Sequence, residues 1–457
     1  MHYFHMRCVL PVSLCWILFY SMPVMAASML SEKEAVAHAL KFNPQLSIVE
    51  QQQAAAAARL GAVEGESLPR IDFSYQLRRS DNALDVFADN LNTRDVDPAN
   101  DFTSSALNHP DASVLQMARL SLNWPVYTGG QLQSQVTAAQ ALAQGARYDK
   151  QHVYAQIIHA TLSTYVQIQA MQQNVLQLDD AVTAAQAHVS TTSRLVREGR
   201  IINSDQLTAE VFLSSMQTAR EQAQVMYRQA KTRLRKLIGS EEHEDFIIEA
   251  MSGPEPAPEL SGIESAWQQA LSQRQDLAAL RAQRDAARAE LDARRAVTGP
   301  RVDLVLNQDW YDVIDGEQSS SWTVAGVVSM NLFDGGTQQQ GVKASESSVV
   351  VKSAELTDLK QLIRSEIEDA YVRYKGAQER LSLSKTHVAK ARSNVKQITE
   401  RYGQGRTLLI DVLQAEKSLV EIRRQRLEAL LDLKLASLDL NRANGKLLQQ
   451  YLPPGVE

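Results

Sequence analysis

Two halves of the chain carry the same succession of short motifs, and this duplication constrains the fold more than any other feature of the 457 residues. LNWPVYTGG at 122–130 matches VSMNLFDGG at 328–336, and EGRIINSDQLTAE at 198–210 matches QGRTLLIDVLQAE at 404–416. Both pairs are separated by the same offset of 206 residues. An unchanged offset means that nothing is inserted between the two motifs of either copy. The pattern predicts two copies of one structural unit.

Upstream of these motifs the first copy is longer than the second. LPRID at 68–72 matches GPRVD at 299–303 with an offset of 231 residues, so the first copy holds 25 additional residues. They fall within Arg79 to Ser113, a polar segment that contains two prolines. We predict a long exposed loop there. Its surface should be acidic, because it contains Asp81, Asp85, Asp89, Asp95, Asp97, Asp101 and Asp111.

Each copy also contains a very long helical region. Proline is absent from 126–253 and from 301–452, and both regions are rich in strong helix formers. Residues 131–198 would form about 100 Å of helix at ~1.5 Å per residue, which only a bundle or a coiled coil can stabilise. Apolar residues recur at heptad spacing, which predicts helices that pack along one face. The clearest stripes are Ile168, Met171, Val175, Leu178, Val182, Ala185 and Val189, and Val412, Ala415, Leu419, Ile422, Ala429, Leu433, Ala436 and Leu440.

Four shorter segments alternate between apolar and polar residues, as β-strands with two different faces do. They lie at 71–77, 118–126, 302–307 and 322–332. The alternation fits a membrane barrel strand with one face toward lipid, but a half-buried soluble sheet gives the same alternation and is favoured by the pattern alone. Four strands are too few to close a barrel, and open edges cannot face lipid. A barrel would therefore need strands from several protomers.

The N-terminal segment reads as a secretory signal, cut after Ala26, because an apolar run is followed by small residues. Both cysteines, Cys8 and Cys15, lie within it, so neither a disulfide nor a thiolate metal site is expected in the mature chain. No later apolar stretch approaches the ~20 residues of a membrane helix. The net charge of -6 provides no basic face for a nucleic acid.

The order of elements resembles that of the TolC family of outer-membrane efflux proteins along the whole mature chain. The resemblance rests on Asn43-Pro44 in an N-terminal helix, on LPR before a strand, on the doubled Gly-Gly motif and on the doubled G-x(5)-D turn. It implies a mainly helical trimer in which four strands per protomer form a twelve-stranded β-barrel, continuous with a twelve-helix α-barrel tunnel. The implied division is a signal peptide (1–26), a first repeat (27–238), an equatorial linker (239–262), a second repeat (263–448) and a tail (449–457).

The resemblance also implies functional positions. A gate at the periplasmic tip would contain Asp411, Tyr402, Asp205, Gln414 and Arg406. Gln414 replaces an acid of the family pattern, and Thr407 stands where the family has an arginine, with Arg406 one place earlier. The alternative is that both aspartates only cap helices, which is a common role for aspartate. The tip that contacts an adaptor would comprise Gly199, Arg200, Gly405, Arg406 and Leu408, and the strand–helix junctions would comprise Pro125, Gly129, Gly130, Gly335 and Gly336.

The function that the resemblance implies is a passive exit duct in the outer membrane that extends into the periplasm. Its partners would be two further copies, a periplasmic adaptor and an inner-membrane ABC or RND-type transporter, for type I protein secretion, multidrug efflux or both. A coiled-coil scaffold without channel activity is the alternative, although it leaves the strands unexplained. An enzyme is not expected, because the chain has no G-x-S-x-G, H-E-x-x-H, Walker or dinucleotide motif. No cofactor or metal is expected either.

Overall fold

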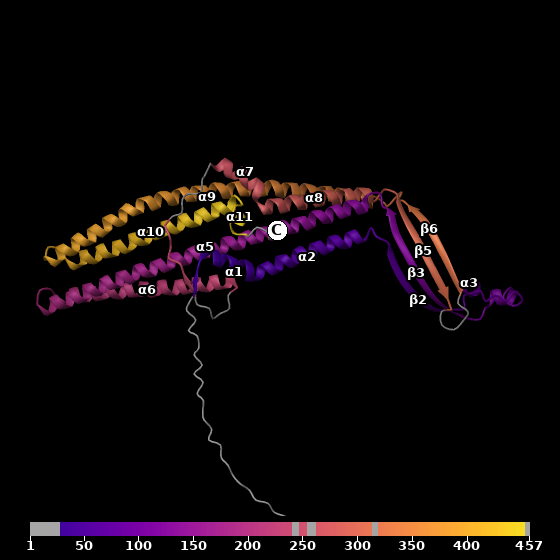
Figure 1. Ribbon diagram of the computed structural model, residues 1–457, viewed down its shortest axis with the longest axis horizontal. Coiled ribbons are helices and arrows are strands. Elements are labelled where there is room, and N and C mark those ends of the chain that lie inside the picture. Colours follow the sequence, from indigo (N-terminus) through magenta and orange to yellow (C-terminus); the bar gives the residue numbers. More distant parts are fainter. Residues whose placement is uncertain (1–27, 240–245, 254–261, 313–318, 453–457) are drawn as a thin grey trace, which may run out of the picture.

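The computed structural model describes residues 28–239, 246–253, 262–312 and 319–452. The predicted signal segment lies outside these ranges. The protein is a long rod with a β-sheet at one end and pairs of long helices at the other (Figure 1).

The element order shows the predicted duplication directly. In each copy two helices lead to strands, and a helix of 67 residues and a returning helix follow. The first copy consists of α1 (Glu32–Phe42), α2 (Pro44–Gly65), β2 (Arg70–Ser80), β3 (Ser113–Tyr127), α5 (Gln131–Arg197) and α6 (Asn203–Ile238). The second consists of α7 (Ile263–Gln273), α8 (Gln275–Ala296), β5 (Arg301–Tyr311), β6 (Ser319–Ser329), α9 (Thr337–Gly403) and α10 (Leu409–Ala443).

The four strands form one antiparallel sheet in the order β2-β3-β5-β6. The predicted alternation is confirmed, since one face exposes large apolar residues: Ile71, Phe73, Leu77, Trp322, Val324 and Val328. The other face is polar and holds the ion pair between Arg119 and Asp309, at 2.6 Å. Several strand boundaries differ from the prediction: β3 begins earlier, at Ser113, and β5 extends to Tyr311. β6 ends at Ser329, so Met330 and Leu332 follow the strand. The outer strands β2 and β6 have no partner on their free edges in the described part of the single chain.

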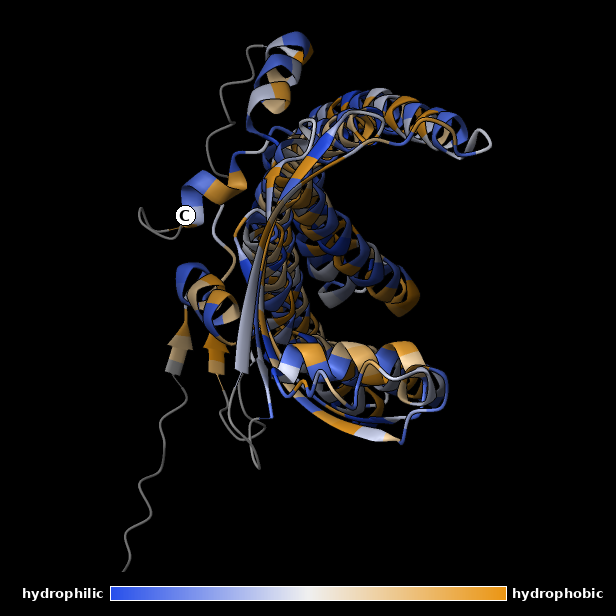
Figure 2. Ribbon diagram, turned by 90° about the vertical axis from the view of Figure 1, so that its right-hand side faces the viewer, coloured by the Kyte–Doolittle hydropathy of each residue, from blue (hydrophilic) through white to orange (hydrophobic). Residues whose placement is uncertain are grey.

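Beside the sheet the helices form a curved layer with an open side (Figure 2). Helix α2 packs on α5, α5 on α8 and α8 on α9. A groove of about 840 Å³ is lined by all four helices. Because the groove contacts both α2 and α9, the two outermost of these four helices, it lies on the concave side of the curved layer. Its polar lining comprises Arg59, Glu66, Gln131, Gln135, Glu290, Arg294 and Ser345.

Farther from the sheet the helices pair as α5 with α6 and α9 with α10. The residues of the predicted heptad stripes are buried or half-buried. The α9–α10 contact is formed by Tyr374, Ala377, Leu381, Ala429, Leu433 and Ala436. Three of these six residues are alanine, which takes up little space between the helices. Of the helices that the structure describes, none has the length and apolar character needed to cross a membrane.

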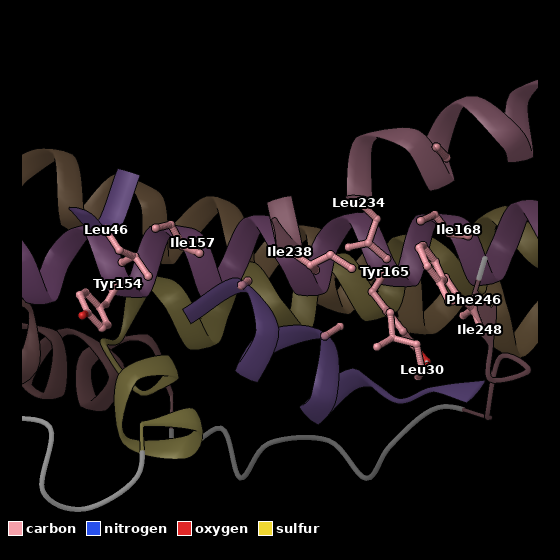
Figure 3. Close-up of a cluster of buried hydrophobic side chains, with 13 residues drawn as sticks. Leu30, Leu46, Tyr154, Ile157, Tyr165, Ile168, Leu234, Ile238, Phe246 and Ile248 are labelled. Atoms are coloured by element: carbon pink, nitrogen blue, oxygen red, sulfur yellow. The ribbon is translucent and has the colours of Figure 1, made fainter. Parts of the chain in front are cut away.

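Short elements form a collar midway along the rod. β1 (Ser28–Leu30) pairs in parallel with β4 (Phe246–Ile248), which belongs to the segment between the two copies. Both strands pack on α5 and α6 through one apolar cluster (Figure 3), and the Tyr165 hydroxyl donates to the Leu30 carbonyl at 2.7 Å. The C-terminal helix α11 (Leu447–Tyr451) packs against α5 as well. These elements lie on the side of the helices away from the open side of the curve (Figure 2).

The segment 79–113 differs from the predicted loop. It contains α3 (Ala83–Thr93) and α4 (Ser104–Asn108), and β2 extends into it as far as Ser80. Asp89 is only 4% exposed and is paired with Arg78. The expected acidic surface is therefore reduced, because part of its charge is neutralised inside the fold.

Candidate functional site

The two G-x(5)-D turns join the helix pairs at the end of the rod farthest from the sheet (Figure 1). They have the same backbone geometry, with φ of 70° at both Gly199 and Gly405. In each turn the residue after the glycine donates its N–H to a carbonyl five residues earlier, at 2.9 Å. This is the Schellman arrangement, in which glycine adopts the left-handed conformation at low cost. The sequence therefore specifies two equivalent tight turns at the tip.

The turns of the two copies meet through a small apolar cluster. Ala209 of α6 packs with Leu409 and Leu413 of α10, and Tyr402 lies against this cluster. The Tyr402 hydroxyl is buried and has no hydrogen-bond partner in the described part of the chain. Burial raises the pKa of Tyr402, and the negative charge of Asp205 raises it further. Tyr402 and Asp205, predicted to interact, thus lie near one another without a hydrogen bond.

Asp411 has a capping role. Its Oδ2 accepts hydrogen bonds from the Thr407 hydroxyl at 2.7 Å and from the Leu408 N–H at 3.3 Å, at the start of α10. Such a bond satisfies an N–H group that has no partner within the helix. Asp411 and Gln414 are nevertheless exposed, as is Arg406. The carboxylate therefore caps its helix and still presents its charge at the tip.

The tip also carries exposed apolar residues. Leu408, which was predicted to contact an adaptor, is 70% exposed just before α10. Ile202 occupies the equivalent position before α6 and is 69% exposed, although the sequence alone did not single it out. The offset between the two copies relates these residues and could have identified Ile202. Arg200 lies in the first turn and forms an exposed ion pair with Glu198 at 3.7 Å.

The strand–helix junctions are also equivalent in the two copies. Gly129 and Gly335 have φ of 63° and 68°, and Gly130 and Gly336 each have φ of 88°. In the first copy the pairing of β3 with β5 shifts register between Pro125 and Tyr127, which is a β-bulge. A bulge bends and twists a strand and accommodates a proline that cannot donate to the ladder. These features turn the chain sharply from the sheet into the long helices.

A charged cluster in the collar was not found from the sequence. Arg274 ends α7 and starts α8, and its side chain is buried against Asp276 and Glu366. Burial raises the pKa of Asp276, but hydrogen bonding and the charge of Arg274 outweigh this effect and lower it overall. Nearby on the rod, Asp439 pairs with His159 at 2.8 Å and Arg373 at 3.2 Å. In the described ranges no three His, Cys, Asp or Glu residues form a group suited to a metal ion.

The fold is that of a protomer of a membrane channel. It joins a four-stranded sheet, which has an apolar outer face and two open edges, to helices that curve around a polar groove. The comparisons with known proteins agree. The family model for the outer membrane efflux protein matches residues 35–240 and 266–446. The chain belongs to the outer membrane efflux protein family.

Similar proteins support the fold. The chain is 22% identical over 344 residues to the outer membrane efflux protein BepC of Brucella suis biovar 1 (strain 1330), covering 73% of each chain. The CmeC outer membrane channel of Campylobacter jejuni superposes with a TM-score of 0.78 at 18% identity, covering 91% of this chain and 85% of that one. The outer-membrane channel OprN gives a TM-score of 0.78 at 19% identity, covering 91% and 90%.

These comparisons confirm the predicted family, the mainly helical and duplicated fold, and the location in the outer membrane with an extension into the periplasm. The protein is an outer-membrane efflux channel and not an enzyme. The coiled-coil scaffold alternative is set aside, because it does not account for the sheet.

Proposed function

We propose that three copies of this chain form a passive exit duct across the outer membrane. The observation that carries the proposal is the pair of open edges on β2 and β6, each 11 residues long, on a sheet whose apolar face is exposed. Unpaired strand edges cannot face hydrocarbon, so β6 of one protomer must pair with β2 of the next. Three protomers supply twelve strands. A barrel of that size has a backbone radius of about 12 Å, taking ~4.8 Å between strands and a tilt of ~40°.

The polar face of the sheet would then line the pore. Arg119 and Asp309 lie on that face, and the concave groove between α2 and α9 continues it along the helices. Because the long helices leave the sheet at one end only, they extend to the periplasmic side and the β2–β3 connection lies outside the cell. We further propose that residues 1–26 are removed and that the linker 239–262 belongs to the equatorial collar.

The gate is proposed to lie at the helix tip. Asp411 and Gln414 are exposed on one face of α10, where three protomers would bring three copies of each around the axis. Tyr402 and Asp205 would hold the two turns of each protomer together, and Arg406 would complete the contacts between protomers. The packing of Tyr402 on the cluster of Ala209, Leu409 and Leu413, which joins the two turns, supports this assignment.

The partners proposed are a periplasmic adaptor and an inner-membrane transporter of the ABC or RND type. The exposed Leu408 and Ile202, together with Gly199, Arg200, Gly405 and Arg406, form a compact surface for the adaptor at each turn. The cargo proposed is a set of toxic small molecules, a protein of type I secretion, or both.

A deletion strain tests this function. Loss of the gene should sensitise the cells to toxic small molecules or abolish secretion of a protein, and the purified protein should conduct ions in a planar bilayer. Replacing Leu408 and Ile202 with aspartate should remove complementation but leave conductance in the bilayer intact. A purified protein that never conducts, in a strain with unchanged export, would refute the proposal.

A further inference from the structure

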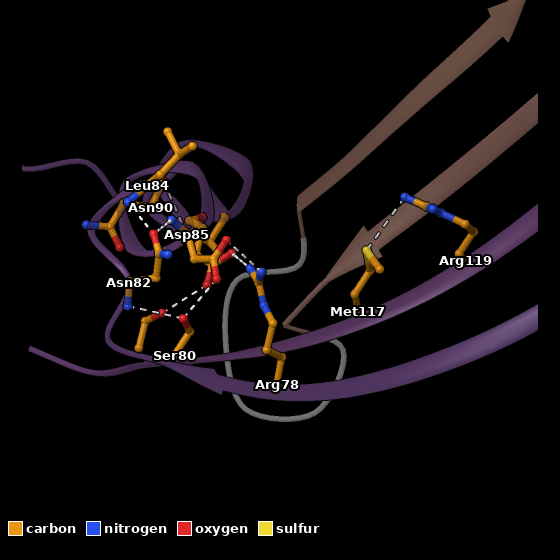
Figure 4. A network of polar contacts seen from close by, with 11 residues as sticks. Arg78, Ser80, Asn82, Leu84, Asp85, Asn90, Met117 and Arg119 are labelled. Atoms are coloured by element: carbon orange, nitrogen blue, oxygen red, sulfur yellow. Dashed lines mark hydrogen bonds and ion pairs between the residues drawn. The ribbon is translucent and has the colours of Figure 1, made fainter.

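Helix α3 has its polar side turned toward the sheet and its apolar side turned away. Asp85 and Asp89 are one turn apart and bind Arg78, and Asp89 also accepts a hydrogen bond from Ser113 at 2.9 Å (Figure 4). The opposite side of the helix carries Leu84, 74% exposed, and Leu91, 50% exposed. An amphipathic helix in water usually buries its apolar face. The reversed arrangement indicates that the apolar face has a partner outside this chain.

The strands show which side of the sheet α3 occupies. Arg78 and Ser80 share the strand face of Asp72 and Ser74, whereas Ile71, Phe73 and Leu77 lie on the opposite, apolar face. At the other edge of the sheet, the Ser319 hydroxyl donates to the Asn92 carbonyl at 2.6 Å, and Ser319 pairs with Tyr311 on the same polar face. Helix α3 therefore crosses the end of the sheet on its polar side, from the β2–β3 connection to β6.

In the proposed trimer this polar side faces the pore. Three α3 helices, each about 10 Å across with side chains, would be anchored on the inner wall of a mouth whose radius is about 12 Å. They cannot avoid one another in that space. Because Asp85 and Asp89 face the wall, Leu84 and Leu91 face the axis, where the same residues of the other two copies arrive.

We propose that the partner of this apolar face is a second and a third copy of α3, and that the three helices form an apolar constriction at the extracellular mouth. The inference rests on the proposed trimer. It assigns the channel a second narrow point, far from the gate at the helix tip. Phe102 extends the apolar surface, since its ring packs edge-on against Phe87 with 5.7 Å between ring centroids. Apolar constrictions of this kind control passage by excluding water.

Cysteine cross-linking of the full-length protein tests the constriction. Both native cysteines lie in the predicted signal segment, so a single introduced cysteine is expected to be the only thiol in the mature protein. Leu84→Cys and Leu91→Cys, treated with a short bismaleimide in outer-membrane vesicles, should give cross-linked pairs of chains. At most two of every three chains can react in this way. Leu77→Cys is the matched control, because it is 65% exposed near the same end of β2 but on the apolar face, and it should give none.

The outcomes separate the constriction from the trimer. If an amine-reactive cross-linker yields trimers but Leu84→Cys and Leu91→Cys pair no more than Leu77→Cys, then α3 does not meet its copies and this inference is overturned. The same absence of cross-linked pairs is expected if the apolar face of α3 inserts into the outer leaflet of the membrane instead. If the amine-reactive cross-linker yields no trimer, the proposed function fails and the constriction with it.

Discussion

Substitution of Asp411 by asparagine separates the two roles of this residue. An asparagine carbonyl can accept the same bonds from the Leu408 N–H and the Thr407 hydroxyl, so the cap survives while the charge is lost. Alanine removes both the cap and the charge. We expect Asp411→Ala to lower the stability of the protein by about 1 kcal/mol per protomer and Asp411→Asn to leave it almost unchanged.

The electrostatic effect should be the same in both variants. If the proposed trimer places the three carboxylates about 6 Å from its axis, they attract a monovalent cation by about 1 kcal/mol in water with 0.1 M salt, after screening. This energy corresponds to an enrichment of cations of about five-fold at the constriction and to an equal depletion of anions.

Reversal potentials in a planar bilayer under a salt gradient measure this bias, and thermal unfolding followed by circular dichroism measures the cap. Asp432→Asn is a suitable control, because Asp432 is an exposed acid on the same helix, paired with Arg380 and away from the tip. The reasoning fails if Asp411→Asn keeps the cation selectivity of the parent, since Asp411 would then be a helix cap only.

Three further predictions follow from other parts of the molecule. Tyr402→Phe combined with Asp205→Ala should raise single-channel conductance, because the two substitutions remove the hydroxyl and the carboxylate that are proposed to hold the tip closed in the trimer. Unchanged conductance would exclude these two groups from the gate. Gly129→Ala should destabilise the protein more than Gly335→Ala in thermal unfolding. Alanine costs about 1–2 kcal/mol at either site because φ is positive, but of the two sites only Gly129 would bring the new Cβ against a backbone oxygen, that of Ala296 at 3.2 Å. Equal losses of stability in the two variants would contradict this explanation. His159 lowers the pKa of Asp439 through its hydrogen bond, so the stabilisation of the folded protein by the Asp439 carboxylate is complete above the unfolded pKa of about 4 and is lost as the pH falls through the lower folded pKa. The difference in melting temperature between the parent and Asp439→Asn should therefore shrink below about pH 4. A difference that grows there would contradict this role of Asp439.

Much of the fold could be predicted because its periodicities are long and repeated. Absence of proline over more than a hundred residues, together with the heptad stripes, predicted a helix from Gln131 that the structure ends at Arg197. The equal offset of the turn motifs predicted two equivalent tips, and Gly199 and Gly405 have the same φ. The alternation of the strands predicted their two faces, although it could not show where β6 ends.

Helix α3 was not predicted, and the reason is physical. Its acidic residues gave the segment the composition of an exposed loop, while Arg78, which compensates two of them, lies on the preceding strand. The buried Arg274 cluster was missed for a similar reason, since its partner Glu366 is 92 residues away in the sequence. Charge compensation between distant segments leaves no periodic pattern in a sequence.

In the proposed trimer, neighbouring copies close the open edges of the sheet. A cryo-electron microscopy reconstruction of the protein extracted from outer membranes tests it most directly. We expect a three-fold symmetric particle in which β6 of each protomer is hydrogen-bonded to β2 of the next, around a continuous pore. A monomeric particle, or an assembly in which β2 and β6 remain unpaired, would contradict it.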